Sequence, residues 1–177
     1  MANHPGVSRW SRTMLLAGAL ALPSQAANGP TAGSPLPSFS AKDLLGQEHS
    51  SLQFSGQRTL IVAITDKNAG HPMRRWFEAA DVRLPATVQR ASLVSLQLPF
   101  VVSLGTARRY ARQHVPQRYW ESTLLDRDGA MAEALGLPFS EQPYVLSVDE
   151  HGRIVAVVHG PPDSPEAGRI WSSLSGH

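Results

Sequence analysis

Arg58-Thr-Leu-Ile-Val-Ala-Ile-Thr65 is a run of aliphatic and β-branched residues, bounded by Gly56 and by the polar residues 66–70. Such continuous apolar character is typical of a central strand that is buried on both faces. After Pro72, which suits the first turn of a helix, the apolar residues take helical spacing. They are Met73, Trp76, Phe77, Ala80 and Leu84. A buried strand followed directly by an amphipathic helix indicates an α/β domain.

The rest of the chain continues this pattern of short strands and helices. Two short strands are expected within 39–52, on either side of a turn at Gly46. Further strands are expected at 92–98 and 122–125, and helices at 107–114, capped by Thr106, and at 130–135, ended by Gly136. The clearest feature is a β-hairpin of 143–149 and 153–159. Ser164-Pro165-Glu166 then opens a final helix, whose inner side carries Ile170, Trp171 and Leu174.

The first 26 residues have the organisation of a secretory signal peptide. Arg9 and Arg12 precede an apolar run at 14–22, and Ser24-Gln25-Ala26 places small residues at the −3 and −1 positions of a cleavage site. The run is too short to span a bilayer, which needs about 20 apolar residues, so no transmembrane span is expected. We therefore expect a periplasmic or secreted protein, cleaved near Ala26. Residues 27–37 are expected to form a flexible Pro/Gly-rich lead-in to one domain at 38–177.

The composition excludes several classes of protein. The chain has 177 residues and no cysteine, so it can form no disulfide, thiolate nucleophile, Cys-ligated zinc site or iron–sulfur cluster. It has 16 basic and 14 acidic residues, and removal of residues 1–26 takes away two arginines and no acid. Because the mature chain is then formally neutral, nucleic acid is not an expected partner.

The order of the expected elements resembles that of the thioredoxin-like fold. Leu36-Pro-Ser-Phe39 followed by the Gly46 turn resembles the first segment of redoxins and TlpA-like proteins, and residues 125–137 resemble their D-x-x-G-x-x-A-x-x-x-G-V segment. Pro143 stands where thioredoxins carry their cis-proline. Within the superfamily, the chain resembles most the YtfJ-type periplasmic proteins, which lack the redox cysteines. The resemblance implies an α/β domain with a central mixed β-sheet flanked by helices, and a C-terminal β-hairpin and helix.

The resemblance also points to a candidate binding surface. In redox-active thioredoxins a Cys-x-x-Cys pair opens the helix after the first long strand, and the matching residues 66–73 contain no cysteine. Thiol–disulfide exchange and cysteine-dependent peroxidase activity are therefore excluded. The candidate surface consists of Asn68, Gly70, His71, Gln142 and Pro143, and we expect a cis bond between Gln142 and Pro143. His71 could act as a base or bind an anion, or it could be a partly exposed residue at a helix start.

A candidate basic patch is formed by Arg108, Arg109, Arg112 and Arg118, with Tyr110, Tyr119 and Trp120 between them. It suits an anionic partner such as a lipid headgroup, a glycan or an acidic protein face. The alternative is a solvated helix face that its aromatic residues anchor to the core. The histidines show no metal-ligand spacing, and Asp126-Arg-Asp-Gly129 lacks the later ligands of a calcium loop. We therefore expect no metal and no cofactor.

Two functions stay open on this basis. We expect an exported, redox-inactive thioredoxin-fold protein that acts as a protein- or peptide-interaction or regulatory module, with another exported protein or peptide as its partner. The alternative is a non-thiol enzyme or ligand-binding protein that uses a pocket near His71 and Pro143. No catalytic residue is assigned. A carboxylate close to His71 would favour the enzyme, whereas a shallow apolar groove would favour the interaction module.

Overall fold

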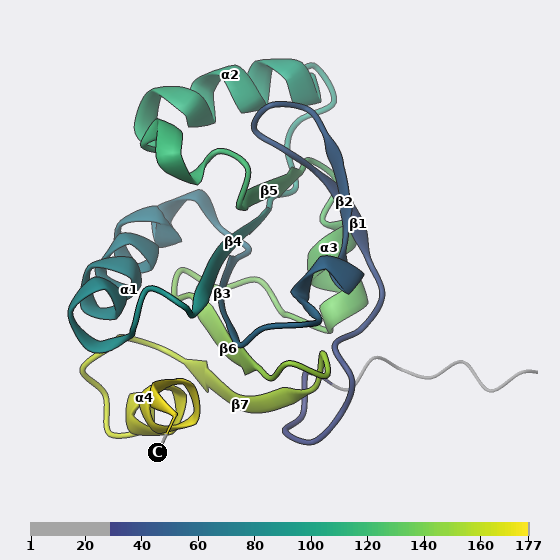
Figure 1. Cartoon of the computed structure of the whole chain (residues 1–177). Helices are drawn as coiled ribbons and strands as arrows, with labels where there is room; N and C mark the ends of the chain where they lie inside the picture. Colours follow the sequence, from purple (N-terminus) through teal and green to yellow (C-terminus); the bar gives the residue numbers. More distant parts are fainter. Residues whose placement is uncertain (1–28, 177) are drawn as a thin grey trace, which may run out of the picture.

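A computed structural model describes residues 29–176, which form a seven-stranded mixed β-sheet with helices on both faces (Figure 1). The strand order is β2-β1-β5-β4-β3-β6-β7. Strands β3, β4 and β5 run parallel, and the remaining pairs are antiparallel. The strands are β1 (Ser40–Asp43), β2 (Glu48–Ser50), β3 (Thr59–Ile64), β4 (Gln89–Ser95), β5 (Thr123–Asp126), β6 (Tyr144–Val148) and β7 (Ile154–His159). This is the mixed sheet with a C-terminal hairpin that the sequence predicts.

Helices α1 and α4 pack on one face of the sheet and α3 packs on the other (Figure 1). Because side chains alternate along a strand, β3 supplies both cores: Leu60 and Val62 pack with α1, and Ile61 and Ala63 with α3. All six residues of β3 are buried, as predicted for the central strand. The helices are α1 (Gly70–Arg83), α2 (Leu104–His114), α3 (Ala130–Leu135) and α4 (Ala167–Ser175), and the 3-10 helices are η1 (Ser51–Phe54), η2 (Lys67–Ala69) and η3 (Gln117–Tyr119).

The apolar side predicted for helix α1 is confirmed, and its centre is Trp76. This side chain is fully buried and lies against Trp171 of α4, with the ring centroids 4.9 Å apart. Its Nε1–H donates to the carbonyl oxygen of Gly160 at 2.8 Å, which joins α1 to the segment after β7. The three residues predicted to face inward from α4 are also buried. Helix α4 and the segment that follows β7 are therefore both packed against α1.

Two predicted boundaries in the middle of the chain are wrong. Strand β4 begins at Gln89 rather than Ser92, because its parallel pairing with β3 starts there, and it ends at Ser95. Beyond that point Leu98 donates its N–H to Arg127 instead of continuing along β3. Helix α2 begins three residues earlier than predicted. The residue that caps it is Ser103, whose Oγ accepts from the N–H of Thr106 at 3.1 Å.

The segment before β1 also differs from the expectation. Residues 33–36 pair with the start of β7: Gly33 N–H donates to Ile154 at 2.7 Å, Ile154 N–H to Ser34 at 2.9 Å, and Leu36 N–H to Gly152 at 2.9 Å. The prediction of a flexible lead-in is therefore wrong for these four residues. The predicted signal peptide lies outside the described residues. Within 29–176, no helix has both the length and the apolar character needed to cross a membrane.

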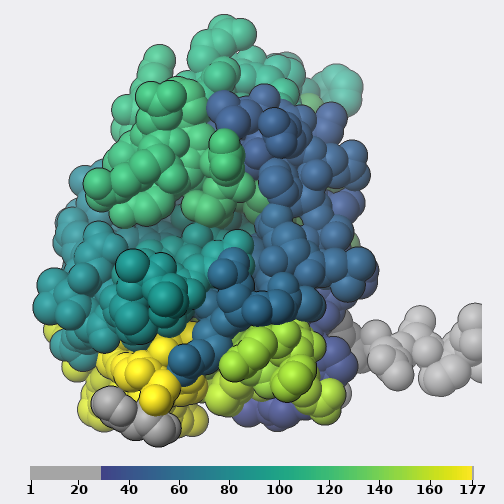
Figure 2. All heavy atoms as spheres, viewed as in Figure 1, coloured from purple at the N-terminus to yellow at the C-terminus, as the bar shows by residue number. Residues whose placement is uncertain are grey.

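Different loops lie at the two ends of the parallel strands. Because β6 runs antiparallel to β3, the turn after β6 lies at the amino end of β3, where Gly56 N–H donates to Glu150 at 2.8 Å. Figure 2 shows this end of the sheet, with the segment before β3 in blue against the β6–β7 turn in lime green. The loops that contain the candidate site lie at the opposite end, near the carboxyl ends of the parallel strands β3, β4 and β5.

Candidate functional site

The first part of the site is the segment that joins β3 to α1. Asp66 directly follows the strand, is buried, and accepts the N–H of Asn68 at 2.6 Å through Oδ1. This bond caps η2, which runs into α1 at Gly70. His71 lies in the first turn of α1 and is exposed to solvent. The helix start that carries thiols in redox-active thioredoxins is therefore formed here, with an imidazole beside it.

The second part is the loop 137–143, which is bound to the end of β3. Thr65 Oγ1 donates to Pro138 C=O at 3.1 Å and accepts the N–H of Ser140 at 2.9 Å. Ser140 Oγ in turn accepts the N–H of Gln142 at 2.9 Å. These bonds place the loop against the start of α1, where the side chain of Asn68 donates to Glu141 at 3.4 Å.

The predicted cis bond before Pro143 is wrong, since no peptide bond within residues 29–176 is cis. The trans form is the intrinsically favoured one, and the hydrogen bonds of Thr65 and Ser140 already bring the loop to the helix. Pro143 itself is buried, and its carbonyl accepts the N–H of Gly160 at 3.2 Å. Because Gln142 N–H is bonded within the loop, it is not available to pair with an incoming strand.

A pocket of about 220 Å³ lies where the two parts meet. It is lined by His71, Pro72, Arg75, Gln142, Pro161 and Pro162. Two of the predicted site residues, His71 and Gln142, thus share one pocket. Asn68 is connected to the neighbouring Glu141, whereas Gly70 and Pro143 lie outside the lining. No carboxylate belongs to the lining. The guanidinium of Arg75 forms an ion pair with the exposed carboxylate of Asp163, with a nitrogen–oxygen distance of 3.3 Å.

Sequence reasoning missed a serine–histidine contact beside this pocket. Ser140 Oγ lies 2.8 Å from His159 Nε2, at the end of β7, and the ring of His159 stacks on Tyr144 with centroids 4.2 Å apart. The two residues are 19 positions apart in loops and strand ends, so no motif links them. Within the described residues no acidic side chain hydrogen-bonds His159, and no group of three metal-ligating side chains is found. The contact therefore lacks the third group that orients a catalytic histidine.

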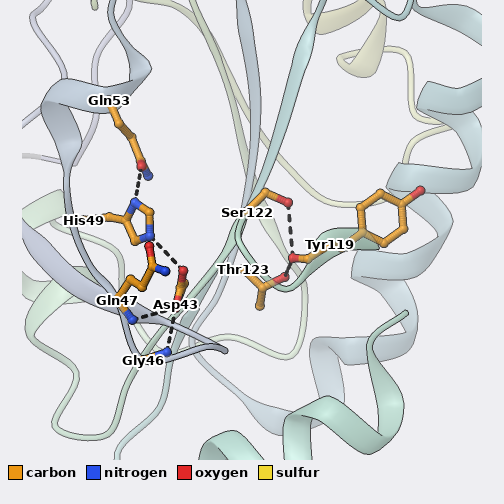
Figure 3. Close-up of polar contacts among 8 residues, drawn as sticks. All are labelled: Asp43, Gly46, Gln47, His49, Gln53, Tyr119, Ser122 and Thr123. Carbon is orange, nitrogen blue, oxygen red and sulfur yellow. Dashed lines mark hydrogen bonds and ion pairs between the residues drawn. The ribbon is translucent and has the colours of Figure 1, made fainter. Parts of the chain in front are cut away.

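A second polar network lies at the β1–β2 turn (Figure 3). Asp43 is buried, accepts the N–H groups of Gly46 and Gln47 at 2.7 and 2.9 Å, and lies 2.9 Å from His49 Nε2. Burial acts to raise the pKa of Asp43, but the hydrogen bonds from His49, Gln47 and Gly46 outweigh it, so the pKa lies below its ordinary value. His49 Nδ1 lies 2.7 Å from Gln53 Oε1. The network closes the turn and holds η1 to it.

The basic patch does not form a single surface. Arg108 points inward and packs on Gly46 of the β1–β2 turn, whereas Arg109, Arg112 and Arg118 are exposed. The guanidinium groups of the last two lie over aromatic rings, Arg112 over Trp120 at 5.6 Å and Arg118 over Tyr119 at 4.7 Å. Figure 3 shows the Tyr119 carbonyl accepting from Ser122 and Thr123, which fixes η3 to the start of β5.

Comparisons with known proteins agree with this architecture. The chain matches no protein-family model and no curated protein. A protein assigned as the thiol:disulfide interchange protein DsbE from Chlorobium tepidum aligns with 82% of this chain and 99% of its own, with a TM-score of 0.61 and 16% identity. MTB dsbF covers 81% of this chain and 99% of its own (TM-score 0.56, 20% identity). The exposed lipoprotein thioredoxin Etrx1 of Streptococcus pneumoniae covers 77% and 99% (TM-score 0.56, 13% identity). At these identities the likeness shows the fold alone: the chain has the thioredoxin-like fold and no cysteine.

Proposed function

We propose that this protein is an exported, redox-inactive member of the thioredoxin-like superfamily that binds an extended segment of another exported protein at the pocket between α1 and the loop 137–143. The resemblance to YtfJ-type periplasmic proteins is part of this proposal, because those proteins also lack the redox cysteines. The signal-like residues 1–26 support export.

The observation that carries the proposal is the composition of the pocket at the redox position. Three of its six lining residues, Pro72, Pro161 and Pro162, present rigid apolar surface, and His71, Gln142 and Arg75 present polar groups. A few polar groups around apolar surface are typical of ligand-binding pockets. The absence of a carboxylate from the lining argues against acid–base catalysis by His71, which would need an orienting partner.

The trans bond before Pro143 changes how a peptide would be held. In thioredoxins the backbone beside the cis-proline pairs with the substrate chain, but here Gln142 N–H is bonded to Ser140. We expect recognition to rest on side chains instead. The Gln142 amide and the His71 ring offer hydrogen bonds, and Arg75 suits a carboxylate on the bound segment, provided that it leaves its exposed pair with Asp163.

Site-specific photo-crosslinking in the cells that produce the protein tests the proposal. A photoreactive amino acid at position 142 should give a discrete crosslinked protein, which His71→Ser should weaken. The same amino acid at position 150, which is exposed in the β6–β7 turn at the other end of the strands, is the matched control. Identical products from both positions, or none from position 142, would refute binding at this pocket. Export is tested separately by intact mass, which should give a chain that begins at Ala27.

A further inference from the structure

Residues 97–120 form the most one-sidedly charged segment of the chain. They contain four arginines and one histidine and no acidic residue. The segment holds α2 and η3, which Figure 1 and Figure 2 show at the top of the molecule, away from α4 and the β6–β7 turn. Its charge is therefore presented on one part of the surface, and none of its residues belongs to the lining of the pocket of the proposed function.

Helix α2 is held only weakly by the body of the protein. None of its 11 residues is buried. Its inward side consists of Leu104, Ala107, Arg108 and Ala111, all partly exposed, and its outward side presents Arg109, Tyr110 and Arg112. Tyr110 is 66% exposed. A helix normally buries an apolar stripe against its own domain, whereas α2 has no buried residue and leaves Arg109, Tyr110 and Arg112 exposed to a partner.

The turn that leads into α2 adds apolar groups to this surface. Phe100 and Val101 are 91% and 88% exposed, and they occupy the centre of a turn closed by the N–H of Val102 and the carbonyl of Pro99 at 2.9 Å. They precede the first residue of α2 by only a few positions. Two adjacent apolar side chains with almost no contact to their own domain mark an interaction site rather than a folding requirement.

We propose that this α2 surface, made of Phe100, Val101, Arg109, Tyr110 and Arg112, docks on a lipid bilayer that contains anionic lipids. The Phe100–Val101 turn inserts among the acyl chains just below the headgroups, and the arginines pair with lipid phosphates. Tyr110 has the amphipathic ring that favours the headgroup level. Helix α2 is about 16 Å long, so the turn and the arginines lie within reach of one patch of membrane.

An acidic protein face is the other anionic partner to consider, and the turn argues against it. Such a face would supply the negative charge, but it would need in addition an apolar pocket shaped for the two protruding side chains. A bilayer has both, with the phosphates outside and the hydrocarbon directly below. The combination of exposed arginines with an apolar turn tip therefore favours lipid.

Co-sedimentation of the full chain with vesicles is the test. Vesicles of phosphatidylcholine alone are compared with vesicles of equal parts phosphatidylcholine and phosphatidylglycerol. We expect binding to the anionic vesicles only. Arg109→Gln with Arg112→Gln should weaken it about 30-fold, from about fivefold per arginine, whereas the corresponding double lysine variant should stay close to the wild type. Phe100→Ser with Val101→Ser should weaken it at least about tenfold.

Matched controls separate this surface from general charge and general apolar exposure, and the binding due to residues 9–22, which include Arg9, Arg12 and the apolar run, is the same in every variant. Arg74→Gln with Arg169→Gln removes the same charge from exposed positions on α1 and α4, and Val82→Ser removes an exposed apolar group from α1. These variants should bind as the wild type does. Thermal unfolding confirms that every variant is folded. Equal binding to both vesicle types, or equal loss in the controls, would overturn the proposal. Wild-type binding by the Phe100/Val101 variant would also overturn it, because the turn would then not insert, and no binding of the wild type to either vesicle type would favour an acidic protein partner.

Discussion

Asp126 is expected to be the polar residue on which the α3 side of the domain depends most. It ends β5 and is buried, and its carboxylate accepts three hydrogen bonds: from Gly129 N–H at 2.9 Å, Met131 N–H at 2.6 Å and Ser95 Oγ at 2.9 Å. Gly129 precedes α3 and has no side chain with which to cap it. Asp126 therefore acts as the cap from three residues upstream.

The substitution Asp126→Asn keeps the shape but leaves one oxygen where there were two. Either Gly129 N–H or the pair formed by Met131 N–H and Ser95 loses its acceptor, depending on how the amide turns. A lost bond to a charged group together with a donor left unpaired in the interior costs about 3 kcal/mol. For a domain of this size that corresponds to a fall in Tm of about 6–12 °C.

Urea unfolding at neutral pH measures the loss, with Asp128→Asn as the matched control. Asp128 is exposed and accepts only the N–H of Ala130 at 3.4 Å, so its substitution should change stability by less than about 0.5 kcal/mol. Burial raises the pKa of Asp126, so the folded state holds this proton more tightly than the unfolded state. The advantage of the wild type over Asp126→Asn should therefore shrink as pH rises above about 4. Equal stability of Asp126→Asn and Asp128→Asn would refute the capping role of Asp126.

Three further substitutions test other contacts by the same unfolding measurement. Trp76→Phe should cost about 3 kcal/mol, because it removes buried volume and a hydrogen bond to a backbone carbonyl. Gly46→Ala and Gly33→Ala should each cost about 1–2 kcal/mol, because both positions have positive φ, and at Gly46 the Cβ would in addition displace the end of the Arg108 side chain. Asp43→Asn should cost stability at neutral pH and progressively less below about pH 4, because the folded-state pKa of Asp43 is lowered and its contribution is lost on protonation. A pH-independent cost would contradict that assignment.

The elements with a clear hydrophobic period could be predicted from the sequence. The buried strand β3, the apolar side of α1 and the hairpin β6–β7 were expected where they are found, because burial on one or both faces fixes their residue types. The end of α3 at Gly136 was also expected, since its positive φ of 63° needs glycine. These elements are sufficient to establish the order of the fold.

The candidate site was predictable only in part, because its contacts join distant residues. The resemblance to thioredoxins joined His71 and Gln142 in one candidate surface, and the two residues line one pocket. The cis bond was wrong, since the hydrogen bonds of Ser140 to Thr65 and Gln142 depend on positions that no local pattern connects. For the same reason the cap at Asp126, whose partner Ser95 lies 31 residues away, looked like an ordinary turn.

The short pairing of residues 33–36 with β7 bears on where the chain can be shortened. Strand β7 is the last strand of the sheet, and an uncovered last strand offers its free N–H and C=O groups to other chains. Residues 33–36 occupy those groups at the beginning of the strand. Cleavage after Ala26 would leave this cover in place, whereas a protein trimmed to the predicted domain start at residue 38 would lose it. Such a trimmed protein should self-associate through β7 even though every helix and strand of the sheet is still present.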